Sequence, residues 1–276
     1  LVESNICEGV QNNILGTFSI VKATINQKVK NLVLISSDKA VKPTNVMGAS
    51  KRFAELCLQV YKDKYPLTNF SIVRFGNVLA SSGSVIPKFK QQIMEGGPVT
   101  LTHNDVTRYF MTVPEAAQLV IQAGALGKNA EVFVLDMGKS IKIRDMIIKM
   151  TNLSGQKLKD KDNLVGDIEI KVIGLRPGEK LYEELLIGDN PEKTIHPKIQ
   201  KISEPSISFE QFEKNINELI IQLNNQDSVQ VKKILDRVIR FYNSNSELVD
   251  YIHNEQKDLK DTLPNKDDKN NVIKLN

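Results

Sequence analysis

The stretch Asn31-Leu-Val-Leu-Ile-Ser-Ser37 is the clearest indication of fold class in the sequence. Four consecutive apolar residues between polar ends predict a strand that is buried on both faces, as in a parallel sheet. Apolar residues recur every three to four positions over 5–27 and 47–63, on either side of this strand, and predict two helices. A second apolar stretch, 70–75, predicts the next strand. Helix, strand, helix and strand in this order indicate an α/β fold with right-handed crossovers.

The alternation of elements continues along the chain. Further elements are predicted as helices at 85–95, 114–126, 142–153, 209–223 and 228–243, strands at 131–135 and 168–173, a loop at 156–166, and a short helix after 175–180. We expect three regions: 1–200 as the main α/β part, 201–253 as C-terminal helices, and 254–276 as a disordered tail rich in Asn, Lys and Asp.

Composition excludes several classes of protein. Of the 276 residues, 41% are hydrophobic and 25% are charged, which is typical of a globular protein. The net charge of +4 is small and no RNA- or DNA-binding motif occurs, so no nucleic-acid partner is expected. The sequence contains no run of about 18 apolar residues, so we expect no membrane span within this chain. The two cysteines form no CxxC pair and the three histidines have no metal-ligand spacing, so a disulfide framework and a metal site are not expected.

The sequence contains no GxGxxG motif, although dinucleotide-binding α/β proteins carry one after their first strand. Two interpretations remain open. Either the protein does not bind a dinucleotide, or the first βαβ half of the fold is missing from this chain. The first residue is Leu1 rather than Met, which favours a piece of a longer protein.

Candidate chemical groups follow the first predicted strand. Ser36, Ser37, Asp38 and Lys39 stand at its carboxyl end, the edge at which open α/β sheets bind ligands. An aspartate beside a lysine can exchange protons with a substrate; the alternative is a surface turn with two solvated charges. Eight residues after Lys39, Met47-Gly-Ala-Ser-Lys51 places a thioether and an ammonium group on one face of a helix, and the thioether cannot move a proton.

Long motifs connect these residues with a known family. The stretch from Ser37 to Lys51 resembles the CapD-like nucleotide-sugar 4,6-dehydratases of bacterial polysaccharide biosynthesis, which are extended short-chain dehydrogenases/reductases. Further matching motifs are Arg74-Phe-Gly-Asn-Val78, Ser81-Ser-Gly-Ser-Val-Ile-Pro87, Thr107-Arg-Tyr-Phe-Met111 and Leu175-Arg-Pro-Gly-Glu-Lys-Leu-Tyr-Glu-Glu184. Most members have tyrosine at the position of Met47. In having methionine there, the chain resembles a large membrane-anchored subgroup that acts on UDP-N-acetylglucosamine.

The resemblance implies a fold and a reaction. The fold is the second part of a Rossmann-type, doubly wound parallel sheet, with a smaller substrate-binding α/β region and the C-terminal helices. Bound NAD or NADP oxidises the sugar at C4, water leaves across C5 and C6, and the hydride returns to C6. By position in the motif, Lys39 is the C5 base, Asp38 the acid, and Ser37 binds the C4 oxygen. Lys51 holds the nicotinamide ribose, and Ser36 and Phe75 also line the cofactor.

The resemblance also implies a substrate site. Arg108 and Arg176 suit the diphosphate, because guanidinium groups bind phosphate oxygens in pairs. Glu179 would accept a hydrogen bond from the nucleotide ribose. Ser84 precedes a helix whose N-terminus attracts anions. Asn77 could reach the cofactor or the sugar phosphate, and Met47 would face the sugar.

Two alternatives remain beside a dehydratase. A UDP-sugar C4 epimerase of the same superfamily needs no base at C5, so Lys39 argues against it. The other alternative is an inactive fragment that binds a sugar nucleotide. With either enzyme we expect a UDP-sugar substrate, a homo-oligomer and a cytoplasmic location, in a parent protein anchored to the inner membrane outside this chain.

Overall fold

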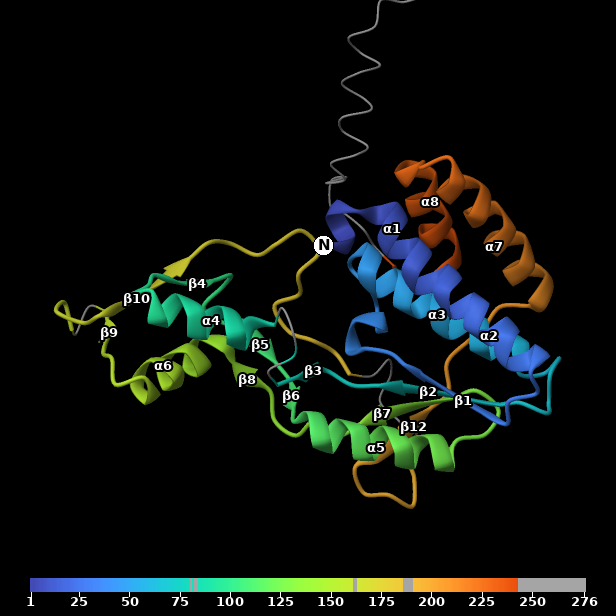
Figure 1. Ribbon diagram of the computed structural model, residues 1–276, viewed down its shortest axis with the longest axis horizontal. Coiled ribbons are helices and arrows are strands. Elements are labelled where there is room, and N and C mark those ends of the chain that lie inside the picture. Colours follow the sequence, from blue (N-terminus) through green and yellow to red (C-terminus); the bar gives the residue numbers. More distant parts are fainter. Residues whose placement is uncertain (80, 82–83, 161–162, 186–190, 243–276) are drawn as a thin grey trace, which may run out of the picture.

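The computed structural model describes residues 1–79, 81, 84–160, 163–185 and 191–242, which form two lobes along one long axis (Figure 1). The larger lobe is built on a five-stranded sheet in the order β1-β2-β7-β12-β11. Its parallel strands are β1 (Asn31–Ile35), β2 (Asn69–Arg74) and β7 (Glu131–Leu135). These confirm the three strands predicted for this region. The antiparallel strands β12 (Ile199–Ile202) and β11 (Glu192–Lys193) extend the sheet beyond the prediction.

Helices cover both faces of this sheet, as expected of a doubly wound fold. On one face lie α1 (Ile6–Val10), α2 (Gly16–Asn26) and α3 (Val46–Tyr61), while α5 (Val113–Leu126) covers the other face (Figure 1). The predicted helix over 5–27 is confirmed, with a π-helical turn at Gln11–Leu15 between α1 and α2. The predicted α/β architecture is therefore confirmed.

The expectation that the first strand is buried on both faces was wrong. Ile35 is 54% exposed, and the apolar residues Leu32, Val33 and Leu34 are only partly buried. In the described part of the chain β1 pairs with β2 alone, so one edge of β1 has no neighbouring strand. By contrast, β2 lies between β1 and β7 and is buried from Phe70 onward.

The C-terminal helices α7 (Phe209–Asn224) and α8 (Ser228–Val238) join the helical layer of the larger lobe (Figure 1). The ring of Phe212 in α7 lies 6.0 Å from that of Phe18 in α2 and 5.6 Å from that of Phe53 in α3. These helices thus share one core with the first helices. The predicted helix 228–243 ends earlier, at Val238, and residues 243–276, with the expected tail, lie outside the described residues.

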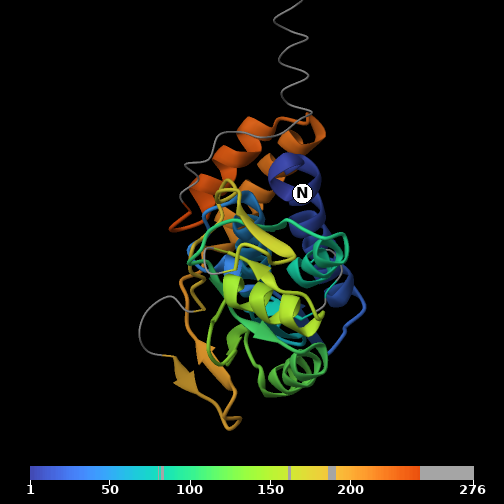
Figure 2. The ribbon, with the colours of Figure 1, turned by 90° about the vertical axis from the view of Figure 1, so that its left-hand side faces the viewer.

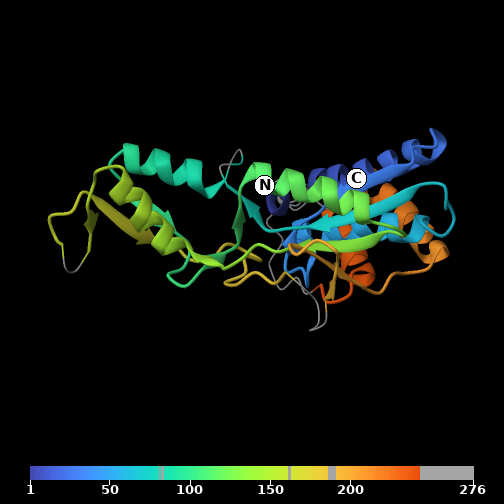
Figure 3. The ribbon, with the colours of Figure 1, turned by 90° about the horizontal axis from the view of Figure 1, so that it is seen from below.

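The smaller lobe has its own core and fits the expected smaller α/β region. Helices α4 (Val85–Met94) and α6 (Ile143–Leu153) pack on a parallel sheet of β4 (Val99–Leu101), β10 (Ile168–Val172) and β9 (Leu158–Lys159). Figure 3 shows this lobe end to end with the larger one, and Figure 2 shows it in front when the view is along the long axis. Strand β9 lies in the expected loop 156–166, which corrects that prediction.

Two short ladders connect the lobes. Strand β3 (Asn77–Val78) pairs with β6 (Phe110–Met111), and β5 (Thr107–Arg108) pairs with β8 (Ile141–Lys142). The short helix expected after 175–180 does not form over residues 181–185, where the chain makes bends, and residues 186–190 lie outside the described part of the chain. No helix of the described residues is both long and apolar enough to cross a bilayer.

Candidate functional site

The segment Ser37–Lys39 is held at the carboxyl end of β1. The amide of Asp38 donates to the carbonyl of Phe75, at 3.1 Å, so the pairing of β1 and β2 continues past their last strand residues. Ser37 caps the 3-10 turn Asp38–Ala40, where its hydroxyl accepts from the amide of Lys39 at 3.3 Å. The pattern of an apolar strand followed by polar residues thus places these side chains at a sheet edge that can bind ligands.

Asp38 and Lys39 form the acid–amine pair that the sequence predicts. Lys39 Nζ lies 2.8 Å from Asp38 Oδ1, which also accepts from the Ser37 hydroxyl at 2.9 Å. Lys39 donates further to Asn77 Oδ1, at 3.3 Å. Asp38 is fully buried, and its Oδ2 has no hydrogen-bond partner among the described residues. Gly76 leaves this oxygen room, since a Cβ at that position would lie 3.2 Å from it.

A buried ion cluster supports this edge of the sheet from behind. The Ser36 hydroxyl donates to Glu55 Oε1 at 2.6 Å, and Arg74 donates to both oxygens of Glu55. Burial acts to raise the pKa of Glu55, but Arg74, with help from Arg52 and Ser36, outweighs it and the net pKa is lowered. The hydroxyl of Ser36, expected at the cofactor, is therefore committed to this cluster.

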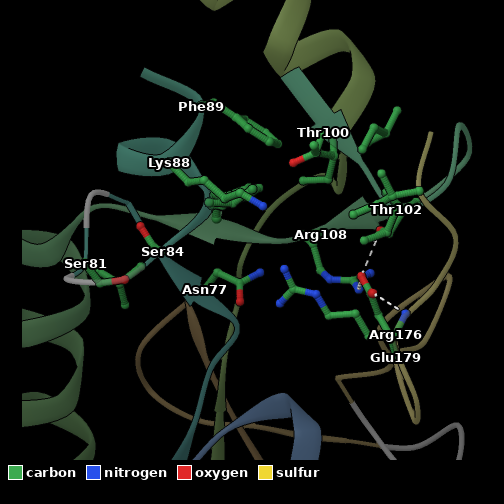
Figure 4. Close-up of a pocket in the computed structure, with 17 residues that line it drawn as sticks. Asn77, Ser81, Ser84, Lys88, Phe89, Thr100, Thr102, Arg108, Arg176 and Glu179 are labelled. Carbon is green, nitrogen blue, oxygen red and sulfur yellow. Dashed lines mark hydrogen bonds and ion pairs between the residues drawn. The ribbon is translucent and has the colours of Figure 1, made fainter. Parts of the chain in front are cut away.

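A first cavity lies where the smaller lobe meets the short ladders that connect the lobes, and Figure 4 shows the residues that line it. It brings together five residues that the sequence assigns to cofactor or substrate: Asn77, Ser84, Arg108, Arg176 and Glu179. Glu179 organises its wall. Its Oε1 lies 3.0 Å from Arg108 Nη2, and its Oε2 accepts from the amide of Arg176 at 3.1 Å. Figure 4 shows both guanidinium groups between Asn77 and Glu179.

The same cavity contains residues that the sequence analysis missed. Lys88 and Phe89 come from α4, while Thr100 and Thr102 lie at β4 and just beyond it. No motif distinguishes these residues in the sequence. They reach the cavity because α4 packs on β4, a contact between segments that sequence periodicity does not predict.

A second cavity shares the same wall and lies on the side of Lys39. Its lining includes Lys39 and Met47 together with Arg108, Arg176 and Glu179. The two cavities therefore meet at the two arginines.

The turn that carries Arg176 and Glu179 is docked on the start of α3. Thr44 and Asn45 donate to the carbonyl of Gly178 at 2.8 and 3.0 Å. A Cβ on Gly178 would come within 2.7 Å of the Asn45 Cβ, so glycine permits this approach. The docking brings the turn beside the helix that presents Met47.

Lys51 and Phe75 lie apart from this pair of cavities. Lys51 lines a third cavity with Leu32, Val33 and Leu34 of β1, two asparagines of the π-helical turn and the first residues of α2. Burial lowers the pKa of Lys51, and the charge of Glu55 opposes that effect. Phe75 packs, partly buried, on the core beneath α5. The structure thus joins Asp38, Lys39 and Asn77 by hydrogen bonds, but it places Lys51 in neither the first nor the second cavity.

Comparison with known proteins gives relatives for most of the chain. Capsular polysaccharide biosynthesis protein CapD of Staphylococcus aureus is 48% identical over 241 residues, which cover 86% of this chain and 38% of CapD. UDP-glucose 4-epimerase of Rickettsia massiliae is 36% identical over 188 residues, 67% of this chain and 52% of that protein. The chain thus spans less than two thirds of the length of either relative.

Solved structures agree with this relationship. Pen from Bacillus thuringiensis is 36% identical with a TM-score of 0.65, and the match covers 79% of this chain and 71% of Pen. DesIV, a dTDP-glucose 4,6-dehydratase of Streptomyces venezuelae solved with NAD, shares the fold at 15% identity and a TM-score of 0.55, over 82% of this chain and 69% of DesIV. The sequence pattern of the family described as "Polysaccharide biosynthesis protein" matches residues 1–204. With three quarters of its length matched in this way, the chain belongs to that polysaccharide biosynthesis family.

Proposed function

We propose that the protein carrying this chain is an NAD- or NADP-dependent 4,6-dehydratase of UDP-N-acetylglucosamine-type substrates. One observation carries the proposal: the Asp38–Lys39 pair stands beside the wall at which two cavities meet, and that wall is made of two arginines. A nucleotide sugar matches this layout. Its nucleoside would occupy the cavity of Lys88 and Thr100, its diphosphate would lie at the arginines, and its hexose would face Lys39.

The residues present fit one end of a nicotinamide cofactor. Lys51 has a partly buried amine in the cavity beside β1, where it could bind the nicotinamide ribose. The buried Asp38 Oδ2 has no hydrogen-bond partner among the described residues, so a ligand that reaches this end of β1 could donate to it. The glycine-rich sequence that would bind the cofactor's diphosphate does not occur in this chain.

The protein groups can balance every proton of the reaction. NAD would supply the hydride chemistry, accepting hydride from C4 and returning it to C6. Ser37 donates to Asp38 in the structure, so it can relay the C4 hydroxyl proton to that carboxylate. Asp38 then gives this proton to the C6 hydroxyl, which leaves as water. Lys39 removes the C5 proton and returns it when C6 has been reduced.

The relatives support this chemistry class and leave a competing reaction. DesIV is named a 4,6-dehydratase, whereas the Rickettsia protein is named a UDP-glucose 4-epimerase. Epimerisation needs only the removal of hydride from C4 and its return to the same carbon. Lys39 lines the second cavity, where its amine could act as a base. This favours the dehydratase, because of the two reactions only dehydration takes a proton from C5.

The test uses the complete protein from which this chain comes. It is incubated with UDP-N-acetylglucosamine and NAD or NADP, and the products are separated by chromatography and weighed by mass spectrometry. A 4-keto-6-deoxy product that has lost one water supports the proposal. A product of unchanged mass with inverted C4 would instead identify an epimerase, and no conversion would reject both reactions for this substrate.

A further inference from the structure

Glu183 is a buried carboxylate to which neither the sequence analysis nor the proposed mechanism gives a role. It stands in the loop that follows the Arg176–Glu179 turn, and its side chain is 4% exposed. Its Oε1 lies 3.7 Å from Lys39 Nζ and 3.6 Å from Arg108 Nε. One oxygen therefore faces both the amine and the guanidinium group. Glu183 also lines the second cavity.

The other oxygen of Glu183 makes the site unusual. Glu183 Oε2 is buried without a hydrogen-bond partner among the described residues, as is Asp38 Oδ2. Leaving a buried charged oxygen unpaired is costly, and such groups in native proteins call for an explanation. Both carboxylates pair with Lys39. The two unpaired buried oxygens therefore belong to groups that surround the same amine.

We propose that Glu183 is a positioning residue that holds the Lys39 amine and the Arg108 guanidinium group at a fixed separation; this inference rests on the proposed function. Arg108 would meet the substrate's diphosphate, and Lys39 would meet C5 of its hexose. Because one carboxylate oxygen faces both groups, it sets the distance between the phosphate-binding and proton-transferring positions. It also balances positive charge in a buried place where two cations would otherwise repel.

The charged and polar groups facing Lys39 come from several segments. Asp38 and Asn77 contact its amine directly, Glu183 lies 3.7 Å from it, and Arg108 faces the same oxygen of Glu183. Removal of the Glu183 charge leaves Asp38 as the single carboxylate paired with Lys39 among the described residues. The amine would then be held less firmly and would react more readily with a reagent from solvent.

The first experiment measures the reactivity of the Lys39 amine directly and does not require enzymatic activity. The chain is treated with acetic anhydride, and acetylation at each lysine is measured by peptide mass spectrometry. We expect Glu183→Gln to raise acetylation of Lys39 several-fold, while Lys42 is unchanged. The matched control is Glu184→Gln, whose exposed carboxylate pairs with Lys42 at 2.7 Å and should leave Lys39 unaffected. Unchanged Lys39 acetylation in Glu183→Gln would overturn the proposal.

A second variant decides the outcome if Glu183→Gln loosens the whole fold, which would raise acetylation of every lysine. Glu183→Asp keeps the charge, so Lys39 acetylation should stay close to that of the unchanged protein. A rise confined to Lys39 in this variant would contradict a role for the charge.

The complete enzyme separates positioning from folding. We expect Glu183→Gln to lower kcat for dehydration about 10²-fold, the usual cost of a misplaced catalytic group. UDP binding should be retained in calorimetry, because Glu179 still holds the Arg108 guanidinium group at 3.0 Å. Loss of UDP binding together with kcat would indicate a structural role and reject the inference. If the unchanged enzyme performs no dehydration, the proposed function fails, whereas the acetylation result still decides whether Glu183 controls Lys39.

Discussion

Arg74 Nη2 lies 2.5 Å from Glu55 Oε2, and neither side chain is exposed to solvent. Arg74 is the last residue of β2, and Glu55 belongs to α3. The same guanidinium group donates to Glu204, which follows β12, at 2.6 and 2.7 Å. Ser36, at the end of β1, donates to Glu55 as well. This cluster therefore ties two strand ends to a helix and to the C-terminal part of the sheet, directly behind Asp38.

Glu55→Gln should destabilise the protein strongly. Removing one partner of a buried ion pair leaves an uncompensated charge and costs about 3–5 kcal/mol, measured here as the free energy of unfolding in urea. The control is Glu184→Gln, which breaks an exposed pair with Lys42 and should cost less than about 1 kcal/mol. Equal effects of the two substitutions would show that the buried cluster contributes no more than a surface pair.

The same carboxylate should make stability depend on acid pH. Burial acts to raise the pKa of Glu55, but Arg74, Arg52 and Ser36 outweigh it and hold the net pKa below the usual value. A lowered folded-state pKa adds stability above the unfolded-state pKa of about 4.3, and this stability disappears as the pH falls through the folded-state value. Urea unfolding below about pH 4 should therefore show a loss that is smaller in Glu55→Gln. An identical acid loss in both proteins would contradict this assignment.

The local sequence pattern was sufficient to predict that Asp38 and Lys39 follow the carboxyl end of a strand. A short apolar run fixes the strand, and the chain direction of a parallel sheet fixes which edge the next residues occupy. The family motifs supplied Asn77, Arg108 and Glu179, which the structure brings to the same cavity wall or to Lys39. These predictions rest on residues that lie close together in sequence or within one motif.

Other features depend on contacts that no local pattern encodes. Strand β12 is four residues long and pairs with β7 in antiparallel register, which the periodicity of Ile199–Ile202 does not reveal. The exposure of β1 depends on its place at the end of the described sheet, where a strand lies along one edge only. Lys51 was expected at the nicotinamide ribose, and the structure places it in a cavity beside β1 that does not include Lys39. No local pattern shows which cavity a residue of α3 lines. Glu183 was quoted within a motif, yet its burial shows only in the packed structure.

Lys39→Ala should abolish dehydration by the complete enzyme while cofactor binding survives. The substitution removes the amine proposed to take the C5 proton, and Lys39 lies outside the cavity that contains Lys51. Product formation is followed by mass spectrometry, and NAD binding by fluorescence. The control is Lys42→Ala, because Lys42 is exposed and should not matter for turnover. An active Lys39→Ala enzyme would end the proposed role of this residue.

Met47→Ala should keep substantial activity. A thioether cannot carry a proton, so Met47 contributes surface to the second cavity and no chemistry. We expect a change in KM for the UDP-sugar that exceeds the change in kcat, determined from initial rates. Complete loss of kcat in a folded Met47→Ala protein would show that the methionine acts beyond contact with the substrate.

The 276-residue chain by itself should bind NAD weakly or not at all, yet should bind UDP. Its sequence contains no GxGxxG motif, so the backbone amides that cradle a dinucleotide diphosphate are not supplied by this chain. Arg108 and Arg176, in contrast, already form the wall of the first cavity. Calorimetry with each ligand tests both statements, and Arg108→Ala should remove most of the UDP signal while leaving NAD unchanged. Tight NAD binding by the unaltered chain would mean that the cofactor is held by a different set of residues, with Lys51 as the first to examine by substitution.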